Sequence, residues 1–447
     1  MLRSEFRGGY NLKIEGRPEQ NLEQMLEIPE TIAVKAQDVP GLKALVKVRE
    51  GDTVKSGDVL WVHKPDHRIQ FISPWNGTIQ EIRRGKRRVL IEIVIKPDQK
   101  QDFGSFGKID PEKASEQQFV DYLLRTGMWP FFKSIPFNSM ADPEQRPKDI
   151  FIVTNDFEPL CPDLDYVLTG KEEKLQKGVK LLRLLTRGNI VVSKCKTSKT
   201  GPNWNAVDDV RVVEIQPTYP AGHPSVLSYH AFPLRRNDCS WSINAQDLLA
   251  LVDLAESGKW NPARIMTVAG SLAKRRRYVE TYLGSSVQHI LNVDVYEGEK
   301  TYLSGGVFSG IETQEDGYLG FASTSLQVMP TGSQREFLRF VWPGLDKYSF
   351  SRTFLSALFP QEEYKMTTSF QGEDRACIQC GHCEQVCPVE IKPQFLFKSV
   401  MASDFDEAEG LGLKDCAECG LCTYVCPSKI DLAGIINDGL EEIRKEG

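Results

Sequence analysis

Two copies of one cysteine motif near the end of the chain constrain its fold more than any other feature. Each copy reads C-x2-C-x2-C-x3-C-P, which is a ligand pattern for 4Fe-4S clusters, because each corner iron of a cubane takes one thiolate. The two copies hold eight of the 11 cysteines of the chain. The first contains Cys377, Cys380, Cys383 and Cys387, and the second contains Cys416, Cys419, Cys422 and Cys426.

The spacing predicts that the two motifs exchange their fourth cysteines. Three cysteines at steps of three wrap a tight turn around three corners, whereas the fourth cannot reach the last corner of the same cube without straining that turn. In two-cluster proteins it serves the other cluster. The first ligand set is therefore Cys377, Cys380, Cys383 and Cys426, and the second ligand set is Cys416, Cys419, Cys422 and Cys387.

Other residues of the motifs fit the same interpretation. Pro388 and Pro427 turn the chain away after each fourth cysteine, and Gly381 and Gly420 lie inside the turns. Without a Cβ, a glycine lets backbone N–H groups approach the sulfurs. A zinc site uses four ligands and leaves no role for eight regularly spaced cysteines. A disulfide framework belongs to secreted chains, and no export signal precedes this one.

Length and composition limit the class of protein. A chain of 447 residues is expected to form three or four domains. No run of about 18 apolar residues is present, so we expect no membrane span, and the first residues lack the apolar core of a signal peptide. Thiolate ligands without an export signal indicate a reducing cytoplasm. The acidic balance and the lack of a nucleic-acid motif argue against nucleic acid as a partner.

Charge is distributed unevenly along the chain. Residues 370–447 hold fifteen Asp and Glu against seven Lys and Arg, so their net charge is 7 − 15 = −8. The rest of the chain is close to neutral, since the total is −6 and −6 − (−8) = +2. Each oxidised cluster with its thiolates adds about −2 more. The motif-bearing part is thus electronegative and favours a basic docking partner.

Patterning along the chain predicts a multidomain α+β protein with four parts. Residues 1–100 hold short strands with G-D-x-V-x-x-G-D-x-L and S-P-x-x-G-x-I, which resemble a biotinyl/lipoyl-type barrel-sandwich hybrid. Residues 101–258 alternate strand and helix patterns, which indicates a parallel sheet in a Rossmann-like α/β domain. Residues 259–335 resemble a β-grasp domain of the soluble-ligand-binding kind. Residues 336–447 are interpreted as a linker and an α-helical ferredoxin domain.

Several further residues draw attention without forming a catalytic group. Lys64 lies where barrel-sandwich domains carry a modified lysine, yet the usual neighbours are missing, and we interpret it as a surface lysine. The run Arg83–Arg88 is either a solvated hairpin tip or a docking site for an anionic partner. Lys274–Arg277 is a second basic run. Cys161, Cys195 and Cys239 are interpreted as small apolar side chains, and His223 as a structural turn residue. For His382, inside the first motif, a hydrogen bond that tunes the cluster and a solvent-facing side chain both remain open.

The order of these parts resembles the A subunit of the sodium-translocating NADH:quinone reductases. The stretches that carry the likeness are Ser73-Pro74 to Val94, Trp241–Asp247, Phe350–Leu355, Lys365–Thr368 and Val425–Lys429. The same order is similar to the C subunit of Rnf ferredoxin:NAD oxidoreductases, and both families are akin to the flavin-bearing subunit of respiratory complex I. By keeping all eight cysteines, the chain is closer to the Rnf protein than to the well-studied members of the first family.

The resemblance implies a peripheral electron-transfer subunit on the cytoplasmic face of the inner membrane. It would carry two 4Fe-4S clusters, bind integral membrane subunits of the complex and work beside quinone, with no catalytic activity as an isolated chain. Two alternatives remain open. One is membership of an Rnf-type complex, and the other is a docking or quinone-site scaffold in which the clusters are structural.

The flavin loop of the complex I relative corresponds to Thr126–Phe137 in this chain. That stretch reads T-G-M-W-P-F-F-K-S-I-P-F, with bulky side chains and one glycine. Backbone N–H groups could not close on a phosphate there. We therefore predict neither flavin nor NADH on this chain.

Overall fold

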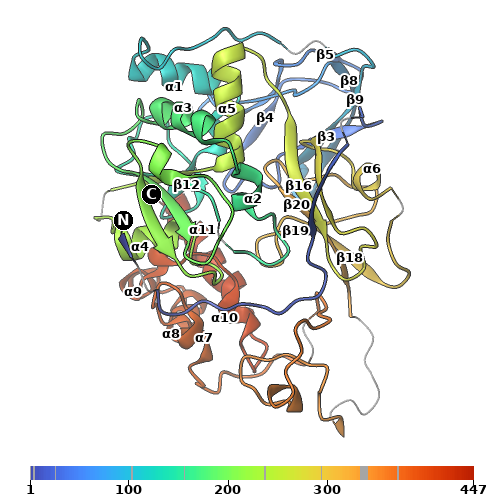
Figure 1. The fold of residues 1–447 in the computed structure, drawn as a ribbon, viewed down its shortest axis with the longest axis vertical. Helices are drawn as coiled ribbons and strands as arrows, with labels where there is room; N and C mark the ends of the chain where they lie inside the picture. Colours follow the sequence, from blue (N-terminus) through green and yellow to red (C-terminus); the bar gives the residue numbers. More distant parts are fainter. Residues whose placement is uncertain are drawn as a thin grey trace.

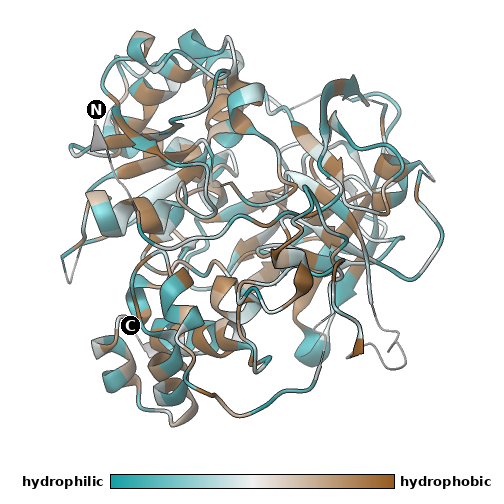
Figure 2. Ribbon diagram, turned by 60° about the horizontal axis from the view of Figure 1, so that its bottom comes forward, coloured by the Kyte–Doolittle hydropathy of each residue, from teal (hydrophilic) through white to brown (hydrophobic). Residues whose placement is uncertain are grey.

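A computed structural model describes residues 2–3, 6–25, 27–101, 104–155, 157–235, 238–292, 294–332, 341–369 and 372–446. The described residues form four sheets and a helical C-terminal part, which lies at the bottom of Figure 1. Brown, apolar stretches lie mainly on the strands, whereas the helices carry teal and brown stretches side by side (Figure 2). The helices therefore bury one face and expose the other.

Two small sheets near the N-terminus form the barrel-sandwich part predicted from the sequence. One is antiparallel throughout, in the order β3-β9-β8-β5, and the other, also antiparallel, has the order β4-β6-β7. The strands are β3 (Ile32–Lys35), β4 (Ala44–Val46), β5 (Thr53–Val54), β6 (Val59–His63), β7 (Gln70–Ile72), β8 (Gly77–Arg84) and β9 (Leu90–Pro97). Trp61, Phe71 and Trp75 belong to the largest hydrophobic core and are almost fully buried, with Phe71 packing on Phe321 and Trp75 on Tyr282.

A seven-stranded, mostly parallel sheet forms the second part, in the order β1-β14-β13-β12-β15-β10-β11. The first five strands pair in parallel and the last two close the edge as an antiparallel hairpin. The strands are β1 (Leu2–Arg3), β10 (Lys133–Ile135), β11 (Ser139–Met140), β12 (Ile150–Val153), β13 (Ile190–Cys195), β14 (Arg211–Ile215) and β15 (Ser240–Asn244). The near-continuous apolar runs of β12 and β13 suit a parallel sheet that is covered on both faces.

Helices cover both faces of this parallel sheet. The helices are α1 (Glu116–Arg125), α2 (Leu164–Leu168), α3 (Glu172–Leu182), α4 (Pro224–Ala231) and α5 (Ala245–Ser257). Ile152 of β12 packs in the same core as Leu248 of α5. Phe151, the neighbouring residue of β12, packs instead in the core that contains Leu227 of α4. Figure 1 shows α3 and α5 on one side and α4 nearer the helical C-terminal part.

A mixed six-stranded sheet forms the third part, in the order β19-β18-β20-β16-β17-β2. Its strands are β2 (Glu19–Gln24), β16 (Ala263–Ala269), β17 (Arg277–Tyr282), β18 (Lys300–Ser304), β19 (Ile311–Thr313) and β20 (Ser325–Pro330). Helix α6 (Val287–Leu291) packs on it through Val287 and Ile290. The loop between β18 and β19 carries Phe308, whose ring meets that of Tyr424 in the helical C-terminal part.

The N-terminal segment links three of the four parts. Sequence patterning placed residues 1–100 in one domain, whereas β1 pairs with β14 of the parallel sheet and β2 pairs with β17 of the mixed sheet. Between these strands the chain passes the first cysteine motif, where Gly9 N–H donates to the Val386 carbonyl at 2.8 Å. Figure 1 shows this dark-blue segment crossing the molecule beside α10 (Leu421–Tyr424). We call residues 6–16 the N-terminal strap.

The C-terminal part consists of short helices and loops. They are α7 (His382–Val386), α8 (Pro393–Met401), α9 (Phe405–Gly410), α10 (Leu421–Tyr424) and α11 (Leu432–Glu446). Helices α7 and α10 contact each other, and α11 packs on α8. Within the described residues, no helix is long and apolar enough to cross a membrane.

Candidate metal centre

The two cysteine motifs fold in the same way. Their equivalent residues are 39 positions apart, since 416 − 377 = 39. In each motif the backbone turns left-handed at the same three places. These places are Gln379, Gly381 and Glu390 in the first motif and Glu418, Gly420 and Lys429 in the second. The repeated spacing thus produces two copies of one loop, each followed by a single short helical turn.

Glycine is required at one of these places in each motif. Gly381 has φ 74° and Gly420 has φ 73°, and each precedes the helical turn that carries the third cysteine. A side chain in this conformation is strained by about 1–2 kcal/mol. The loops depend on these glycines to bring three cysteines around one point.

The structure brings the four cysteines of the first ligand set around one cavity. Cys383 lies on α7, while Cys426 comes from the second motif. The cavity is lined by Cys377, Cys380, Cys383 and Cys426, together with Gln394 and residues of the two cysteine loops. For the first set, the structure therefore has the geometry that an exchange of fourth cysteines requires.

The cysteines of the second ligand set are all at least partly buried. Burial raises the pKa values of Cys416, Cys419 and Cys422 far above those of free thiols. Among the smaller causes, the charge of Cys387 raises each of these three pKa values. Cys387, Cys416 and Cys422 pack in the same hydrophobic cluster. That Cys387 completes the second set stays a prediction.

Backbone N–H groups favour the thiolate form in both motifs. Burial raises the pKa of Cys387, whereas N–H groups of Val389, Glu390 and Ile391 lower it. In the second motif the N–H of Glu418 donates to Cys416 Sγ at 3.4 Å. Such donors compensate the charge of a ligating thiolate and tune a bound cluster. The donor chemistry therefore fits an iron–sulfur cluster.

Gln394 and Glu384 support the first set, and sequence reasoning missed both. The Cys383 thiol donates to Gln394 Oε1 at 3.3 Å, and Gln394 Nε2 donates to Glu384 at 2.7 Å. Burial raises the pKa of Cys383 to about 11. Because Gln394 is buried on α8, one helix after the motif, only the packing of α7 on α8 brings it to the cysteine.

No three Cys, His, Asp or Glu side chains among the described residues converge on a position suited to a single metal ion. A mononuclear zinc site needs sulfurs about 2.3 Å from one point. The cysteines of the first set are instead spread around a cavity. A cluster binds each thiolate at a separate iron, so its ligand sulfurs lie farther apart.

The remaining cysteines and histidines lie outside these sets. Cys195 ends β13 and meets the Thr197 hydroxyl at 3.3 Å, while Cys161 and Cys239 are partly buried in loops of the parallel-sheet part. The ring of His223 accepts from the Ser225 N–H at 3.3 Å and caps α4, which is the structural role predicted for it. His382 packs its ring against Phe350, with the centroids 5.3 Å apart.

The two basic runs have different surroundings. Arg277 is buried and pairs with Glu23 at 2.9 Å, so Lys274–Arg277 helps to hold β17 against β2. In the other run, Arg83 pairs with the buried Glu92 at 2.8 Å. Lys86, Arg87 and Arg88 are exposed at the tip of the β8–β9 hairpin. The exposed Lys64 fits its interpretation as a surface lysine.

The segment Thr126–Phe137 contributes aromatic side chains to the core. Trp129 and Phe132 are fully buried, and Trp129 packs edge-on against Trp241 with the centroids 5.4 Å apart. Trp129 Nε1 donates to the Ala141 carbonyl at 2.8 Å. The side chains that made this stretch unlike a phosphate loop thus fill space inside the protein. That flavin does not bind here stays a prediction.

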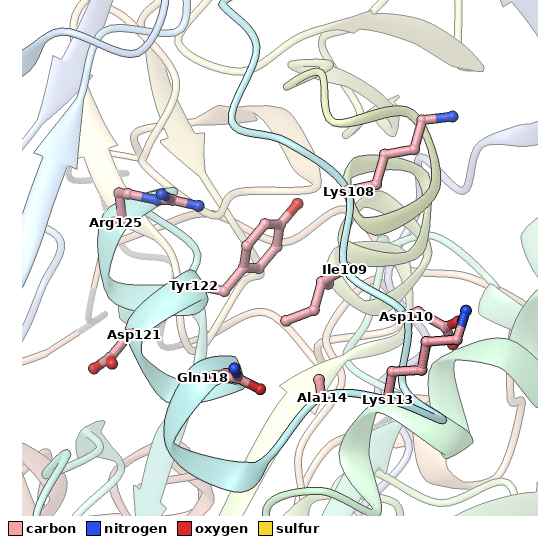
Figure 3. A pocket seen from close by; sticks show the side chains of 9 residues that line it. All are labelled: Lys108, Ile109, Asp110, Lys113, Ala114, Gln118, Asp121, Tyr122 and Arg125. Carbon is pink, nitrogen blue, oxygen red and sulfur yellow. The ribbon is translucent and has the colours of Figure 1, made fainter.

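A larger depression, of about 490 Å³, lies far from the cysteines. Figure 3 shows its lining from α1 and from the loop that precedes that helix. Several of its polar groups already have partners: Arg125 donates to the Phe106 carbonyl at 2.9 Å, and the Tyr122 hydroxyl to the Leu254 carbonyl at 3.0 Å. Figure 1 places α1 at the opposite end of the molecule from the cysteine helices. We assign no function to this depression.

Comparison with family models divides the chain in nearly the same way as the fold. Residues 5–98 match the NqrA N-terminal barrel-sandwich hybrid domain, and residues 114–260 match the NqrA second alpha/beta domain. Residues 265–315 match the NQRA C-terminal domain, and residues 376–430 match a 4Fe-4S dicluster domain. The last match contains both cysteine motifs.

Curated relatives extend over nearly the whole chain. The A subunit of the Na(+)-translocating NADH-quinone reductase of Marinomonas sp. is 32% identical over 444 residues, which cover 98% of this chain and 99% of the relative. The corresponding protein of Pasteurella multocida is also 32% identical, and that of Pseudomonas aeruginosa is 30% identical, both with the same coverage. Among solved structures, an NAD+-reducing [NiFe]-hydrogenase in the air-oxidized state has a TM-score of 0.34 and 13% identity, covering 67% of this chain and 57% of the other.

Proposed function

The chain belongs to the NqrA family, the A subunits of the Na(+)-translocating NADH-quinone reductases, and from this premise we propose that it is an electron-transfer subunit carrying two 4Fe-4S clusters. The observation that carries the proposal is the gathering of four cysteines from both motifs around one cavity, together with a second motif that has the same spacing and the same backbone turns. Each bound cluster would supply one-electron chemistry. The chain itself supplies thiolates, N–H donors and a shell that controls solvent.

The proposal assigns the finer architecture as well. We interpret the parallel-sheet part as Rossmann-like, the mixed sheet as a β-grasp domain and the C-terminal part as an α-helical ferredoxin domain. The parallel order of β14, β13, β12 and β15 supports the first interpretation. The pairing of α7 with α10 and of α8 with α11 supports the last, since it follows the internal repeat of the motifs.

The proposal also concerns location and partners. The relatives are named as subunits of an ion-translocating quinone reductase, and the described helices include none able to cross a membrane. We propose that integral membrane subunits hold this chain at the cytoplasmic face and that quinone is bound at the level of the complex. The buried aromatic side chains of Thr126–Phe137 support the prediction that the isolated chain does not oxidise NADH.

An anaerobic redox titration of the purified chain tests this function. About eight irons with equal labile sulfide per chain, and two clusters that take up one electron each within the range of biological iron–sulfur potentials, are expected. Loading with iron but no reversible reduction would favour the second candidate, a scaffold with structural clusters. One observation supports that candidate, since Cys383, Cys387 and Cys426 are part of the hydrophobic core of the C-terminal part.

A further inference from the structure

The two ligand sets share one backbone fold but differ in exposure. In the first motif Cys380 is exposed, and Ile378 beside it exposes 69% of its surface. Among the described residues, and apart from its neighbours in the chain, nothing lies within 4 Å of the place where a Cβ on Gly381 would stand. At the equivalent positions of the second motif, Ala417 is 3% exposed, and a Cβ on Gly420 would lie 3.1 Å from the ring of Phe308. The outer edge of the first set is open, and that of the second set is covered.

Side chains from two other parts of the molecule make this cover. The Tyr219 hydroxyl donates to the Cys419 carbonyl at 3.0 Å, and its ring stacks on Phe308 with the centroids 5.1 Å apart. Phe308 lies in the loop between β18 and β19 and meets Tyr424 of α10 edge-on at 5.9 Å. The parallel-sheet part and the mixed-sheet part therefore both shield the second set.

The covering loop is held in place by a buried carboxylate. Glu158 accepts from the N–H groups of Phe308 and Ser309, each at 2.8 Å, and from the Ser309 hydroxyl at 2.6 Å. A Cβ on Gly306 would overlap the Glu158 carboxylate. Because three hydrogen bonds fix this loop, the cover of the second set is a built part of the fold rather than a loose contact.

The open edge of the first set lies in an acidic stretch of the chain. In the sequence, the charged residues within six positions of Cys377, Cys380 or Cys383, or within five of Cys426, are the acidic Glu373, Asp374, Glu384 and Asp431 and the basic Arg375 and Lys429. Their net charge is 2 − 4 = −2. Ile378 is exposed within this acidic stretch, so the face combines an apolar side chain with a negative charge balance. Transient redox complexes use small interfaces of this kind, and opposite charge steers the encounter.

We propose that electrons enter or leave the chain over Ile378 and the first ligand set, through a one-electron carrier protein with a basic docking face. The inference rests on the proposed function, because it requires both clusters. One electron passes in each encounter. The donor loses that electron and the acceptor gains it, and no bond is made or broken. The covered second set exchanges electrons inside the complex, by way of the first.

Two variants of the full-length chain test the proposal. Ile378→Arg places a cation at the centre of the open face, and Met401→Arg is the matched control, since Met401 on α8 exposes 68% of its surface. Each variant is loaded, reduced anaerobically and mixed with either of two acceptors, the basic protein cytochrome c or the anion ferricyanide. Ile378→Arg should lower the rate constant with cytochrome c by about tenfold and raise it with ferricyanide, while Met401→Arg matches the unchanged chain. Both effects should fade at high salt.

The opposite signs separate docking from damage, because a damaged cluster would slow both acceptors. Equal rates for the two variants, or a change of the same sign with both acceptors, would overturn the inference. Iron and labile sulfide are measured in every sample. A chain that never loads clusters would contradict the proposed function and not the docking face inferred here. A dissolved dysprosium chelate gives an independent readout. It should broaden the EPR signal that is lost in Cys380→Ala, and broadening of the other signal alone would contradict the proposal.

Discussion

Cys387 is the residue that decides whether the two motifs exchange ligands. It follows α7 of the first motif, yet the exchange assigns it to the three cysteines of the second motif, two of which share its hydrophobic cluster. Cys387→Ala should therefore remove or destabilise the cluster of the second set and leave the EPR signal of the first. Cys239→Ala, in a loop of the parallel-sheet part, should leave both signals unchanged. Loss of the first signal alone would show that the pairing is wrong.

The glycines of the two turns should differ in how strongly they resist substitution. Both have positive φ, so Gly381→Ala should lower the stability of the loaded chain by about 1–2 kcal/mol through backbone strain. Gly420→Ala should cost more, because its new methyl group would also press on Phe308. Urea titrations followed by the visible absorbance of the clusters compare the two. Equal urea midpoints for the two variants would mean that the Phe308 ring moves aside without a loss of stability.

Local spacing explains why the cysteines could be predicted and several supporting residues could not. The cysteine pairing depends on steps of three residues and on the reach of the fourth, and both are visible in the sequence. Glu158 lies 150 residues from the loop that it holds, since 308 − 158 = 150. Neither it nor Tyr219 stands in a recognisable pattern, so only the packing of distant parts reveals them.

Among the elements, α4 is the one whose stability should depend on pH. Burial and, to a smaller extent, the charge of Lys133 together lower the pKa of its capping residue His223 to about 4. A histidine with a lowered folded pKa contributes stability above its unfolded pKa of about 6.5 and loses it as the pH falls towards 4. Because the ring is partly exposed, we expect a loss of no more than about 3 kcal/mol over this range.

His223→Asn isolates this effect, since asparagine also caps helices and does not titrate here. Thermal unfolding of both chains between pH 7 and pH 4 should show a steeper loss for the histidine form. Acid-labile clusters affect both chains alike, so the difference between them reports His223. Parallel curves would show that the ring is protonated without cost in the folded protein.

The β8–β9 hairpin is the second element with a specific expectation. Arg83 pairs with Glu92 inside the sheet, so a docking test should spare it and change Lys86, Arg87 and Arg88 to Gln. Exposed ion pairs contribute little singly, about 0–1 kcal/mol, yet several together steer association and weaken with salt. Release from membranes carrying the complex should then need less salt. The control changes Lys174, Lys177 and Lys180 of α3 to Gln, which removes the same charge elsewhere on the chain. If both triple variants leave the membrane at the same salt concentration, the hairpin is only a solvated tip.

At the scale of the whole molecule, the sequence predicted the order of the parts but not how the N-terminus connects them. The strand β2 reads E-Q-N-L-E-Q and is mostly exposed, so it has none of the alternation that marks a strand. Its partner β17 lies more than 250 residues away, since Tyr278 pairs with Leu22 and 278 − 22 = 256. Pairing over such a separation leaves no local signal.

The same long separations make the N-terminal strap a constraint on biosynthesis. Gly9 leaves the ribosome among the first residues, yet the carbonyl that it binds belongs to Val386, which is 386 − 9 = 377 residues later. At about 10 residues per second, translation takes roughly 40 s to supply that partner. A side chain at Gly8 would meet the Cys387 carbonyl at 2.3 Å, so the strap closes directly over a cysteine of the second ligand set. We therefore expect iron to be loaded late in synthesis, when the chain is nearly complete and its first residues have not yet bound the first cysteine motif.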